Sequence, residues 1–377
     1  MSRWPGKYVI GLTGNIATGK SLVRRMLEHL GAYGIDADAL SHRAIARGAP
    51  GFRPVVETFG KWILNPNGEI DREKLGHLVF NNPEALKNLE NIIHPLVEQA
   101  VDILVRRARQ AVVVIEAIKI LESDLGKECD TIWVTYSPEI VQKSRLMVKR
   151  NMSESEALQR ICAQGSQKTK TSQASVVIYN ISTFEDTWEQ VTEAWKMISP
   201  APVPVPPVEK IPAPDELYVQ RGKPQDSDQI MEFIQSQGNG KSPLLESDIS
   251  LTLGEKAFLL LKTGDQIKGL VAWTVENLVA RTTDLLIDPS ISVPQAINIL
   301  ITEVETASRD LQCEASLLFL SPEMASQTAL WKQLGYEQRT PQTLGVLAWQ
   351  EAAEESLQGN VDLFFKQLRL DRVLRPI

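Results

Sequence analysis

The chain has 377 residues, more than one typical hydrophobic core accommodates, so its length predicts two domains. Hydrophobic residues make up 43% of it and charged residues 23%, the balance of an ordinary globular protein. The net charge of -7 at pH 7 provides no general electrostatic basis for nucleic-acid binding, and we expect no nucleic-acid partner.

The beginning of the chain leads directly into a predicted strand, without the apolar core of a signal peptide. Its apolar runs, such as residues 111–115, are far too short to span a membrane. Cys129, Cys162 and Cys313 match neither a zinc nor a disulfide spacing. These features predict a cytoplasmic protein with reduced cysteines and no membrane partner.

The first predicted elements flank a glycine-rich loop. Residues 8–12 are typical of a short buried strand, and residues 22–30 of an amphipathic helix. The loop between them is Gly14, Asn15, Ile16, Ala17, Thr18, Gly19, Lys20 and Ser21. It fits the P-loop pattern GxxxxGK[ST], in which backbone N–H groups and a helix N-terminus hold phosphates. We therefore expect Lys20 to contact the β- and γ-phosphates of a nucleotide and Ser21 to bind Mg²⁺.

The P-loop pattern predicts phosphate binding and leaves the reaction open, because GTPases and mechanical ATPases carry the same loop. A glycine-rich turn that binds nothing is the weaker alternative. The next strand is expected to end near Asp36 and Asp38, at the sheet edge where open α/β folds bind ligands. Asp38 there can accept the proton of an attacking hydroxyl, or it can simply cap the following helix. The residues alone favour neither reading.

Helical patterns cover residues 71–81 and 83–109 and include His94, which Pro95 follows. A lone histidine is normally a packed or surface residue. Residues 112–115 then form a predicted buried strand that ends before Glu116. This arrangement resembles a Walker B strand, whose terminal acid helps to hold Mg²⁺, although the usual residue is Asp.

Residues 131–135 and 176–179 are the last predicted strands of this half, and residues 138–150, 153–164 and 184–198 its last helices. Arg145, Lys149, Arg150 and Arg160 lie on two consecutive helices. They form either a cationic lid over the phosphates or an ordinary solvated face. Alternating strands and helices predict an α/β fold, a parallel sheet covered on both faces.

A proline-rich segment divides the chain. Seven prolines fall within residues 200–214, a composition that favours an extended, semi-rigid spacer over a packed element. A ligand segment for an SH3-type domain is the weaker interpretation. The predicted domains are residues 1–199 and 215–377, joined by the linker 200–214.

The second half predicts a smaller α+β domain with a largely antiparallel beginning. Its expected strands are residues 218–221, 257–263, 267–275, 283–287 and 315–320, and its expected helices are residues 229–237, 294–311 and 321–334. The basic, amphipathic residues 366–375 are expected to form a packed or solvated C-terminal arm.

Several ordered motifs of residues 1–199 resemble dephospho-coenzyme A kinases. They are IGLTGNIATGKS, GIDADAL, HP at 94–95, SPE…QKSRLMVKR and RICAQ at 160–164. The resemblance implies a P-loop NTPase three-layer sandwich that uses ATP and Mg²⁺ to phosphorylate the ribose 3′-hydroxyl of dephospho-coenzyme A, the final step of coenzyme A biosynthesis. It also implies a helical substrate region near residues 60–110 and a lid near residues 140–170.

The resemblance carries roles to individual residues. It makes Asp38 the base or hydroxyl-orienting group and Lys20 and Arg145 further catalytic residues. It places Asp36 near Mg²⁺ or the substrate, and His94 near the acceptor substrate. Glu116 and Ser21 are the implied metal ligands. The implied nucleotide contacts are Gly14, Asn15, Ile16, Ala17, Thr18, Gly19, Lys20, Ser21, Leu22, Arg150, Arg160 and Asn180.

Three departures from the family pattern stand out. Leu22 replaces a Ser/Thr whose hydroxyl is expected near the α-phosphate, and Lys119 replaces an apolar residue after Glu116 in a segment that lacks the usual proline. Residues 165–175 lack the usual acid before the last strand. Since Lys20, Ser21 and Asp38 are retained, we still expect an active kinase.

The second half resembles GNAT-type acetyltransferases in its opening strand and acidic helix start, in KGLVAW at 268–273 and in WKQLGYE at 331–337. The glycine-containing loop with which that family wraps the pyrophosphate of acetyl-coenzyme A is absent, because residues 289–294 read PSISVP. We therefore expect a GNAT-like domain that is not catalytic, with a coenzyme A thioester as a possible ligand.

Three other functions stay open at this point. The departures near Leu22, Glu116 and Lys119 would suit a non-catalytic, nucleotide-dependent binding or regulatory protein. A kinase for another nucleoside or small alcohol would carry the same phosphate loop. A bifunctional kinase and acetyltransferase requires an active second domain.

Overall fold

The computed structural model describes residues 3–150, 152–198, 216–237, 256–276, 278–357 and 359–370. The chain forms two compact units, Met1–Pro204 with Val373–Ile377, and Val205–Arg372. The predicted linker 200–214 lies outside the described residues, as do the predicted domain ends at 199 and 215 and the last residues of the predicted C-terminal arm. Those boundaries therefore stay predictions.

The first unit is built on a parallel sheet of five strands in the order β2-β3-β1-β4-β5. The strands are β1 (Tyr8–Gly14), β2 (Tyr33–Asp36), β3 (Val112–Glu116), β4 (Thr131–Tyr136) and β5 (Val176–Tyr179). The central strand β1 pairs in parallel with both β3 and β4. The carboxyl ends of β1, β2 and β3 consequently meet at one edge of the sheet. The predicted phosphate loop, Asp36 and Glu116 lie at this edge.

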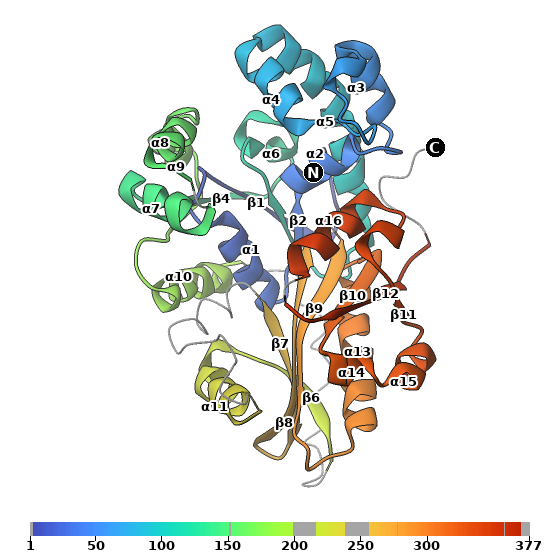
Figure 1. Cartoon of the computed structure of the whole chain (residues 1–377). Coiled ribbons are helices and arrows are strands. Elements are labelled where there is room, and N and C mark those ends of the chain that lie inside the picture. Colours follow the sequence, from blue (N-terminus) through green and yellow to red (C-terminus); the bar gives the residue numbers. More distant parts are fainter. Residues whose placement is uncertain are drawn as a thin grey trace. The chain divides into compact units, whose positions relative to one another are not determined.

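Helices surround this sheet (Figure 1). They are α1 (Lys20–His29), α2 (Ala37–Ala44), α3 (Phe52–Phe59), α4 (Arg72–Asn81), α5 (Pro83–Arg107), α6 (Asp124–Lys127), α7 (Glu139–Arg150), α8 (Glu154–Cys162), α9 (Gln167–Thr171) and α10 (Phe184–Lys196), with short 3-10 turns η1 (Lys61–Ile63) and η2 (Ile120–Glu122). One face of the sheet packs through Ile10, Leu12 and Trp133 onto Met26 of α1 and Val191 of α10.

The opposite face of the same strands is also buried. Val9, Val113 and Ile115 alternate with the residues that face α1 and are fully covered. Burial on both faces confirms the predicted three-layer α/β fold. The predicted helix 138–150 and strand 176–179 agree with α7 and β5, and the predicted helix 83–109 agrees with the long helix α5, which contains Pro95.

The second unit contains a mixed sheet of seven strands in the order β11-β12-β10-β9-β8-β7-β6. The strands are β6 (Tyr218–Arg221), β7 (Ala257–Thr263), β8 (Gln266–Glu276), β9 (Val279–Ile287), β10 (Ala315–Leu320), β11 (Glu337–Gln338) and β12 (Asp362–Gln367). Among the strands that the structure describes in this unit, only β9 and β10 pair in parallel. Neighbours from β6 to β9 are antiparallel, as predicted, which confirms the α+β class of this half.

In its described residues, the second unit has the helical elements η3 (Pro224–Asp226), α11 (Ser227–Gln237), α13 (Val293–Asp310), α14 (Pro322–Ala325), α15 (Thr328–Gln333), η4 (Pro341–Thr343) and α16 (Leu347–Ser356). Three hydrophobic clusters cover the strands of this sheet. Leu300 of α13 belongs to one of them, Phe233 of α11 to a second and Trp349 of α16 to a third, and each cluster contains different strand residues.

One prediction for this half was wrong. The single helix expected over residues 321–334 is two short helices, α14 and α15, which are separated at Gln327, whose backbone is not helical. The indole N–H of Trp331 donates to the carbonyl of Met324 across this break. Lys366, the first residue of the expected C-terminal arm, pairs with Ser316 within the β10–β12 ladder, so the beginning of the arm is packed.

Candidate active site at the carboxyl edge of the first sheet

The phosphate loop connects β1 to α1 in the backbone conformation that the pattern requires. Gly14 and Gly19 have φ angles of 152° and 93°, and a Cβ at Gly19 would lie 2.1 Å from Asn180 Nδ2. Ala17 is left-handed as well, with φ of 58°, an unusual conformation for a residue with a side chain. Gly19 supplies no side-chain cap to α1, so the first N–H groups of that helix are available to phosphate.

Lys20 and Ser21 follow the loop on the first turn of α1. The ammonium group of Lys20 donates to the carbonyls of Gly14 at 3.1 Å and Asn15 at 3.4 Å. Burial lowers the pKa of Lys20, an effect opposed mainly by the carboxylate of Glu116 and then by that of Asp38. A desolvated lysine folded back on its own loop is placed where the phosphates of a nucleotide are expected to bind.

Glu116 ends β3 and is almost completely buried. Its Oε1 accepts a hydrogen bond from Ser21 Oγ at 2.9 Å, and its Oε2 accepts one from Arg24 Nε at 2.8 Å. The two predicted metal ligands therefore touch. A hydroxyl and a carboxylate are oxygen ligands that suit Mg²⁺. Among the described residues, no group of three His, Cys, Asp or Glu side chains is placed to hold a metal. A Mg²⁺ ion held by Ser21 and Glu116 would take phosphate oxygens or water as its further ligands.

Arg24 is a site residue that the sequence analysis did not identify. It is buried on α1 between two acids, with NH1 at 2.6 Å from Glu28 Oε1 and Nε bonded to Glu116. Burial opposes its charge, but Glu28 and Glu116 together raise the pKa of Arg24 above its usual value. The i, i+4 spacing of Arg24 and Glu28 was visible in the sequence, whereas the contact with Glu116, 92 residues away, depends on the β1–β3 pairing.

Asp36 and Asp38 lie on either side of the start of α2. Asp36, the last residue of β2, caps this helix by accepting the N–H of Ala39 at 2.8 Å. The capping role considered for Asp38 was therefore wrong. The Asp38 carboxylate instead accepts the N–H of Ile118, at 3.1 Å to Oδ2 and 3.5 Å to Oδ1.

The surroundings of Asp38 suit a general base. Burial and the neighbouring Asp36 raise the pKa of Asp38 to about 6, against the opposing effects of Lys20 and the Ile118 N–H. A carboxyl group with a pKa near neutrality can be ionised at pH 7 and still accept a proton. Asp38, Asp36, Lys20 and Glu116 interact electrostatically, so the structure brings the predicted groups of three strand ends together.

Arg145 and Asn180 are joined behind the phosphate loop. The guanidinium of Arg145 donates to the carbonyl of Ala17 at 3.1 Å, to Ser137 Oγ at 3.0 Å and to Asn180 Oδ1 at 3.1 Å. Asn180 is buried and donates through Nδ2 to the carbonyl of Thr18 at 3.0 Å. These contacts hold the loop conformation, including the left-handed Ala17. A direct role of Arg145 in the reaction stays a prediction.

Four other predicted residues lie outside this cluster of hydrogen bonds. Arg150 is exposed at the end of α7 within electrostatic range of Lys20, and Arg160 is exposed on α8. His94 is exposed on α5, within electrostatic range of Asp124. Leu22 packs against the apolar core between α1 and the sheet. Their predicted contacts with ATP or the acceptor stay predictions.

Lys170 on α9 is the second residue that the sequence analysis missed. It is 9% exposed, and its Nζ donates to the carbonyl of Ile118 at 2.9 Å. Lysine is rarely buried without a partner. Burial lowers the pKa of Lys170 most, and the nearby positive charge of Lys20 lowers it further. The only sequence signal that could have indicated Lys170 was its position between the predicted lid and the last predicted strand.

The second unit has a different arrangement where β9 leads into α13. Asp288 accepts the N–H of Ser290 at 2.8 Å and pairs with Lys268 at 3.0 Å. Pro294 lies in the first turn of α13, and Ser292 supplies no side-chain cap. An acid in the loop and a missing N–H in the first helical turn both disfavour phosphate binding.

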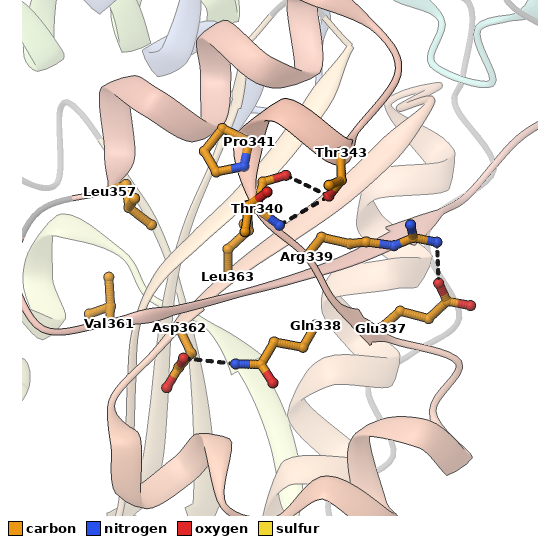
Figure 2. A pocket seen from close by; sticks show the side chains of 10 residues that line it. All are labelled: Glu337, Gln338, Arg339, Thr340, Pro341, Thr343, Leu357, Val361, Asp362 and Leu363. Carbon is orange, nitrogen blue, oxygen red and sulfur yellow. Dashed lines mark hydrogen bonds and ion pairs between the residues drawn. The ribbon is translucent and has the colours of Figure 1, made fainter.

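The second unit also has a hollow of about 620 Å³ beside β11 and β12 (Figure 2). Figure 2 shows that its polar side chains face one another. Gln338 donates to Asp362 at 2.8 Å, and Arg339 pairs with Glu337. Because these groups satisfy each other, the hollow indicates no particular ligand.

In the part of the chain that the structure describes, no helix is long and apolar enough to cross a membrane.

Comparisons with known proteins divide the chain as its two units do. Residues 8–186 match the family model described as dephospho-CoA kinase. The dephospho-CoA kinase of Geobacter metallireducens is 42% identical over 191 residues, which are 50% of this chain and 95% of that protein. The solved structure of TT1252 from Thermus thermophilus is 28% identical and covers 51% of this chain and 99% of its own, with a TM-score of 0.46.

For the second unit the similarity is weaker. The solved structure of a GNAT-family acetyltransferase from Staphylococcus aureus Mu50 is 12% identical and covers 41% of this chain and 100% of its own, with a TM-score of 0.34. A similarity at this level gives no information on activity. The identification rests on the first unit alone: with 42% identity to a relative that it covers almost completely, the chain belongs to the dephospho-CoA kinase family.

Proposed function

We propose that the first unit transfers the γ-phosphoryl group of ATP to the ribose 3′-hydroxyl of dephospho-coenzyme A. The observation that carries this proposal is the position of Asp38. It is a buried carboxylate with a pKa raised to about 6, within electrostatic range of the P-loop lysine Lys20. Phosphoryl transfer to a hydroxyl needs a group beside the γ-phosphate that orients the hydroxyl and accepts its proton. Most of the catalysis in such reactions comes from this positioning and from stabilisation of charge.

The reaction follows from this arrangement. The loop N–H groups, the start of α1 and Lys20 hold the β- and γ-phosphates of ATP. Ser21 and Glu116 would hold Mg²⁺, which neutralises charge on the phosphates when bound. Asp38 accepts the proton of the 3′-hydroxyl as its oxygen bonds to the γ-phosphorus. The bond from that phosphorus to the β,γ-bridging oxygen breaks, and ADP leaves.

Other residues support the nucleotide side. Arg145 and Asn180 fix the left-handed Ala17 and the carbonyl of Thr18, which keeps the loop N–H groups convergent. We propose that Arg150, in range of Lys20, adds positive charge near the phosphates, and that Arg160 and His94 reach their ligands only when ATP and acceptor are bound. The cytoplasm is the proposed location, on the sequence features alone.

An ADP-release assay on the full chain tests this function. Dephospho-coenzyme A is compared with other nucleosides and small alcohols at equal concentration, with Lys20→Ala as the control for contaminating kinases. Turnover that requires dephospho-coenzyme A and Lys20 supports the proposal. Turnover with another acceptor alone would favour a different small-molecule kinase, and no Lys20-dependent turnover with any acceptor would favour a nucleotide-binding module.

We propose that the second unit does not transfer acetyl groups. The Asp288–Lys268 pair and Pro294 make the entry to α13 a poor pyrophosphate site, and this observation supports a non-catalytic role. A coenzyme A thioester remains the ligand class to test. Equilibrium dialysis of the full chain with acetyl-coenzyme A, in the presence of saturating dephospho-coenzyme A, measures binding outside the kinase site. No binding under these conditions eliminates the thioester as a ligand of the second unit.

A further inference from the structure

Lys170 has a geometry that the proposed reaction does not yet use. It lies on the short helix α9, buried beneath the carboxyl edge of the first sheet, and its ammonium donates to the carbonyl of Ile118 at 2.9 Å. Lys168, two residues earlier on the same helix, is exposed. Burying a lysine requires compensation from hydrogen bonds or charge, so a buried one at a site edge calls for an explanation.

The backbone of Ile118 is the link between Lys170 and Asp38. The Ile118 carbonyl accepts two hydrogen bonds, one from Lys170 and one from Thr13 Oγ1 at 2.9 Å. The Ile118 N–H donates to the Asp38 carboxylate at 3.1 Å. Holding the carbonyl on one side of the Ile118 Cα restricts the orientation of the N–H on the other side. Lys170 is therefore one main-chain residue away from the proposed base.

The same segment also contacts the phosphate loop. The N–H of Ile16 donates to Gln164 Oε1 at 2.6 Å, and Asn15 Nδ2 donates to the carbonyl of Gly165 at 2.8 Å. Residues 164–170 thus touch the nucleotide side of the site at one end and, through Ile118, the acceptor side at the other. This arrangement connects the region after α8 to the phosphate loop and, through Ile118, to the proposed base.

We propose that Lys170 is a positioning residue for phosphoryl transfer, which acts on Asp38 through the main chain of Ile118. Its ammonium fixes the Ile118 carbonyl, and the Ile118 N–H in turn keeps the Asp38 carboxylate oriented toward the acceptor hydroxyl. This inference rests on the proposed function, because it assigns Lys170 to the reaction in which Asp38 is the base.

The competing role for Lys170 is direct contact with the transferred phosphoryl group. Its charge interacts with that of Lys20 as well as with that of Asp38, so charge alone does not separate the two roles. The roles differ in what they require of Asp38. A residue that acts through Asp38 loses its effect when Asp38 can no longer accept a proton, whereas a phosphate contact keeps its effect.

A double-mutant cycle on the full chain separates them. The four proteins are the unmodified chain, Lys170→Met, Asp38→Asn and the double variant, each assayed for phosphorylation of dephospho-coenzyme A. We expect Lys170→Met to lower kcat by about 10- to 100-fold in the unmodified background and by less than about threefold beside Asp38→Asn. The KM for ATP is expected to stay within about threefold, since the phosphate loop is intact.

Two further variants control for structure. Lys170→Arg retains a donor to the Ile118 carbonyl and is expected to recover most of the activity, and Lys168→Met is expected to match the unmodified chain. Thermal unfolding of each variant reports whether the fold is retained. If Lys170→Met does not fold, Lys170→Ala takes its place in the cycle, since it also removes the donor to the Ile118 carbonyl.

Three results would overturn the inference. An equal loss of kcat with and without Asp38→Asn would show that Lys170 acts independently of the base. A KM for ATP that rises as much as kcat falls would assign Lys170 to nucleotide binding. An unmodified chain without turnover of dephospho-coenzyme A would refute the proposed function and, with it, this inference.

Discussion

Two strand–loop–helix connections in this molecule share a local plan and differ in what they can bind. In the first unit β1 leads through Gly14 and Gly19, both with positive φ, to α1, whose first N–H groups are uncapped by a side chain. In the second unit β9 leads through a loop containing Asp288 to α13, whose first turn contains Pro294. A strand followed by a helix is therefore not sufficient for a phosphate site. The positive-φ glycines, a first helical turn without proline and the absence of an acid in the loop itself distinguish the first connection.

The surroundings of the two connections differ as well. Around α1 the charged groups come from different strands: Glu116 ends β3 and Asp36 ends β2, and both interact with Lys20. Around α13 the pair Asp288–Lys268 is closed on itself. A cluster of charges that comes from several strand ends and includes a buried lysine is more typical of a functional site, whereas an isolated ion pair is more typical of a structural contact.

The largest expected effect comes from removing the charge that the first connection offers to phosphate. Lys20→Ala should lower kcat/KM for the proposed reaction by about a thousandfold, because Lys20 is the residue that we propose contacts the phosphates that gain charge in the transition state. The matched change in the second unit, Lys268→Ala, should leave kcat/KM unchanged. Steady-state kinetics of both variants check the comparison, and similar losses in the two would remove the distinction between the connections.

Asp38→Asn is expected to have the next largest effect. It retains the size of the side chain but cannot accept a proton, so kcat should fall by about a hundredfold while ATP binding stays nearly intact. Rapid-quench kinetics together with a nucleotide titration measure both quantities. Full activity in this variant would show that the base is a different group.

The pH dependence of kcat follows from the same carboxylate. With the pKa of Asp38 raised to about 6, the base is ionised above that pH and protonated below it. The value of kcat should therefore fall about tenfold per unit as the pH drops below about 6 and be level, as far as this group is concerned, above 7. The residual rate of Asp38→Asn should lack this acidic limb. A limb that persists in that variant assigns the titration to another group.

The smallest effect is expected at the departure from the family pattern in α1. Leu22→Thr restores a hydroxyl near the expected α-phosphate and should lower the KM for ATP by about two- to threefold. Because Leu22 packs on the core, the same change should lower Tm by a few degrees. Leu30→Thr, a residue that packs against the same cluster, is the control for the stability loss. An ATP KM that falls equally in both variants would contradict a specific role for the new hydroxyl.

The sequence predicted the phosphate loop well, because its information is local. The eight consecutive residues 14–21 contain the whole phosphate-loop pattern, including Gly14, Gly19, Lys20 and Ser21. The strand and the helix that flank the loop are adjacent to it in the sequence. The alternation of strands and helices likewise predicted the parallel sheet, since each element carries its own hydrophobic pattern. Asp38 was identified as a candidate for the same reason: it follows a strand that ends at the ligand-binding edge.

The contacts that tune the site were not accessible from the sequence, because they join residues that are far apart in it. Arg24 and Glu116 are 92 positions apart, and Lys170 and Ile118 are 52 positions apart. Two aspartates separated by one residue could not be told apart as cap and base without the geometry of Ala39 and Ile118. In the second half β12 was missed because its sequence, DLFFKQ, alternates poorly and its pairing with β10 is distant in sequence.

The central claim is that the carboxyl edge of the first sheet phosphorylates a ribose 3′-hydroxyl, and the identity of the product tests it most directly. The full chain is incubated with ATP, Mg²⁺ and dephospho-coenzyme A, and the product is analysed by ³¹P nuclear magnetic resonance and mass spectrometry. We expect one new phosphomonoester, on the 3′-oxygen of the ribose, formed together with ADP and absent with Lys20→Ala. A phosphate on another oxygen, or ADP release without any phosphorylated acceptor, would contradict the claim.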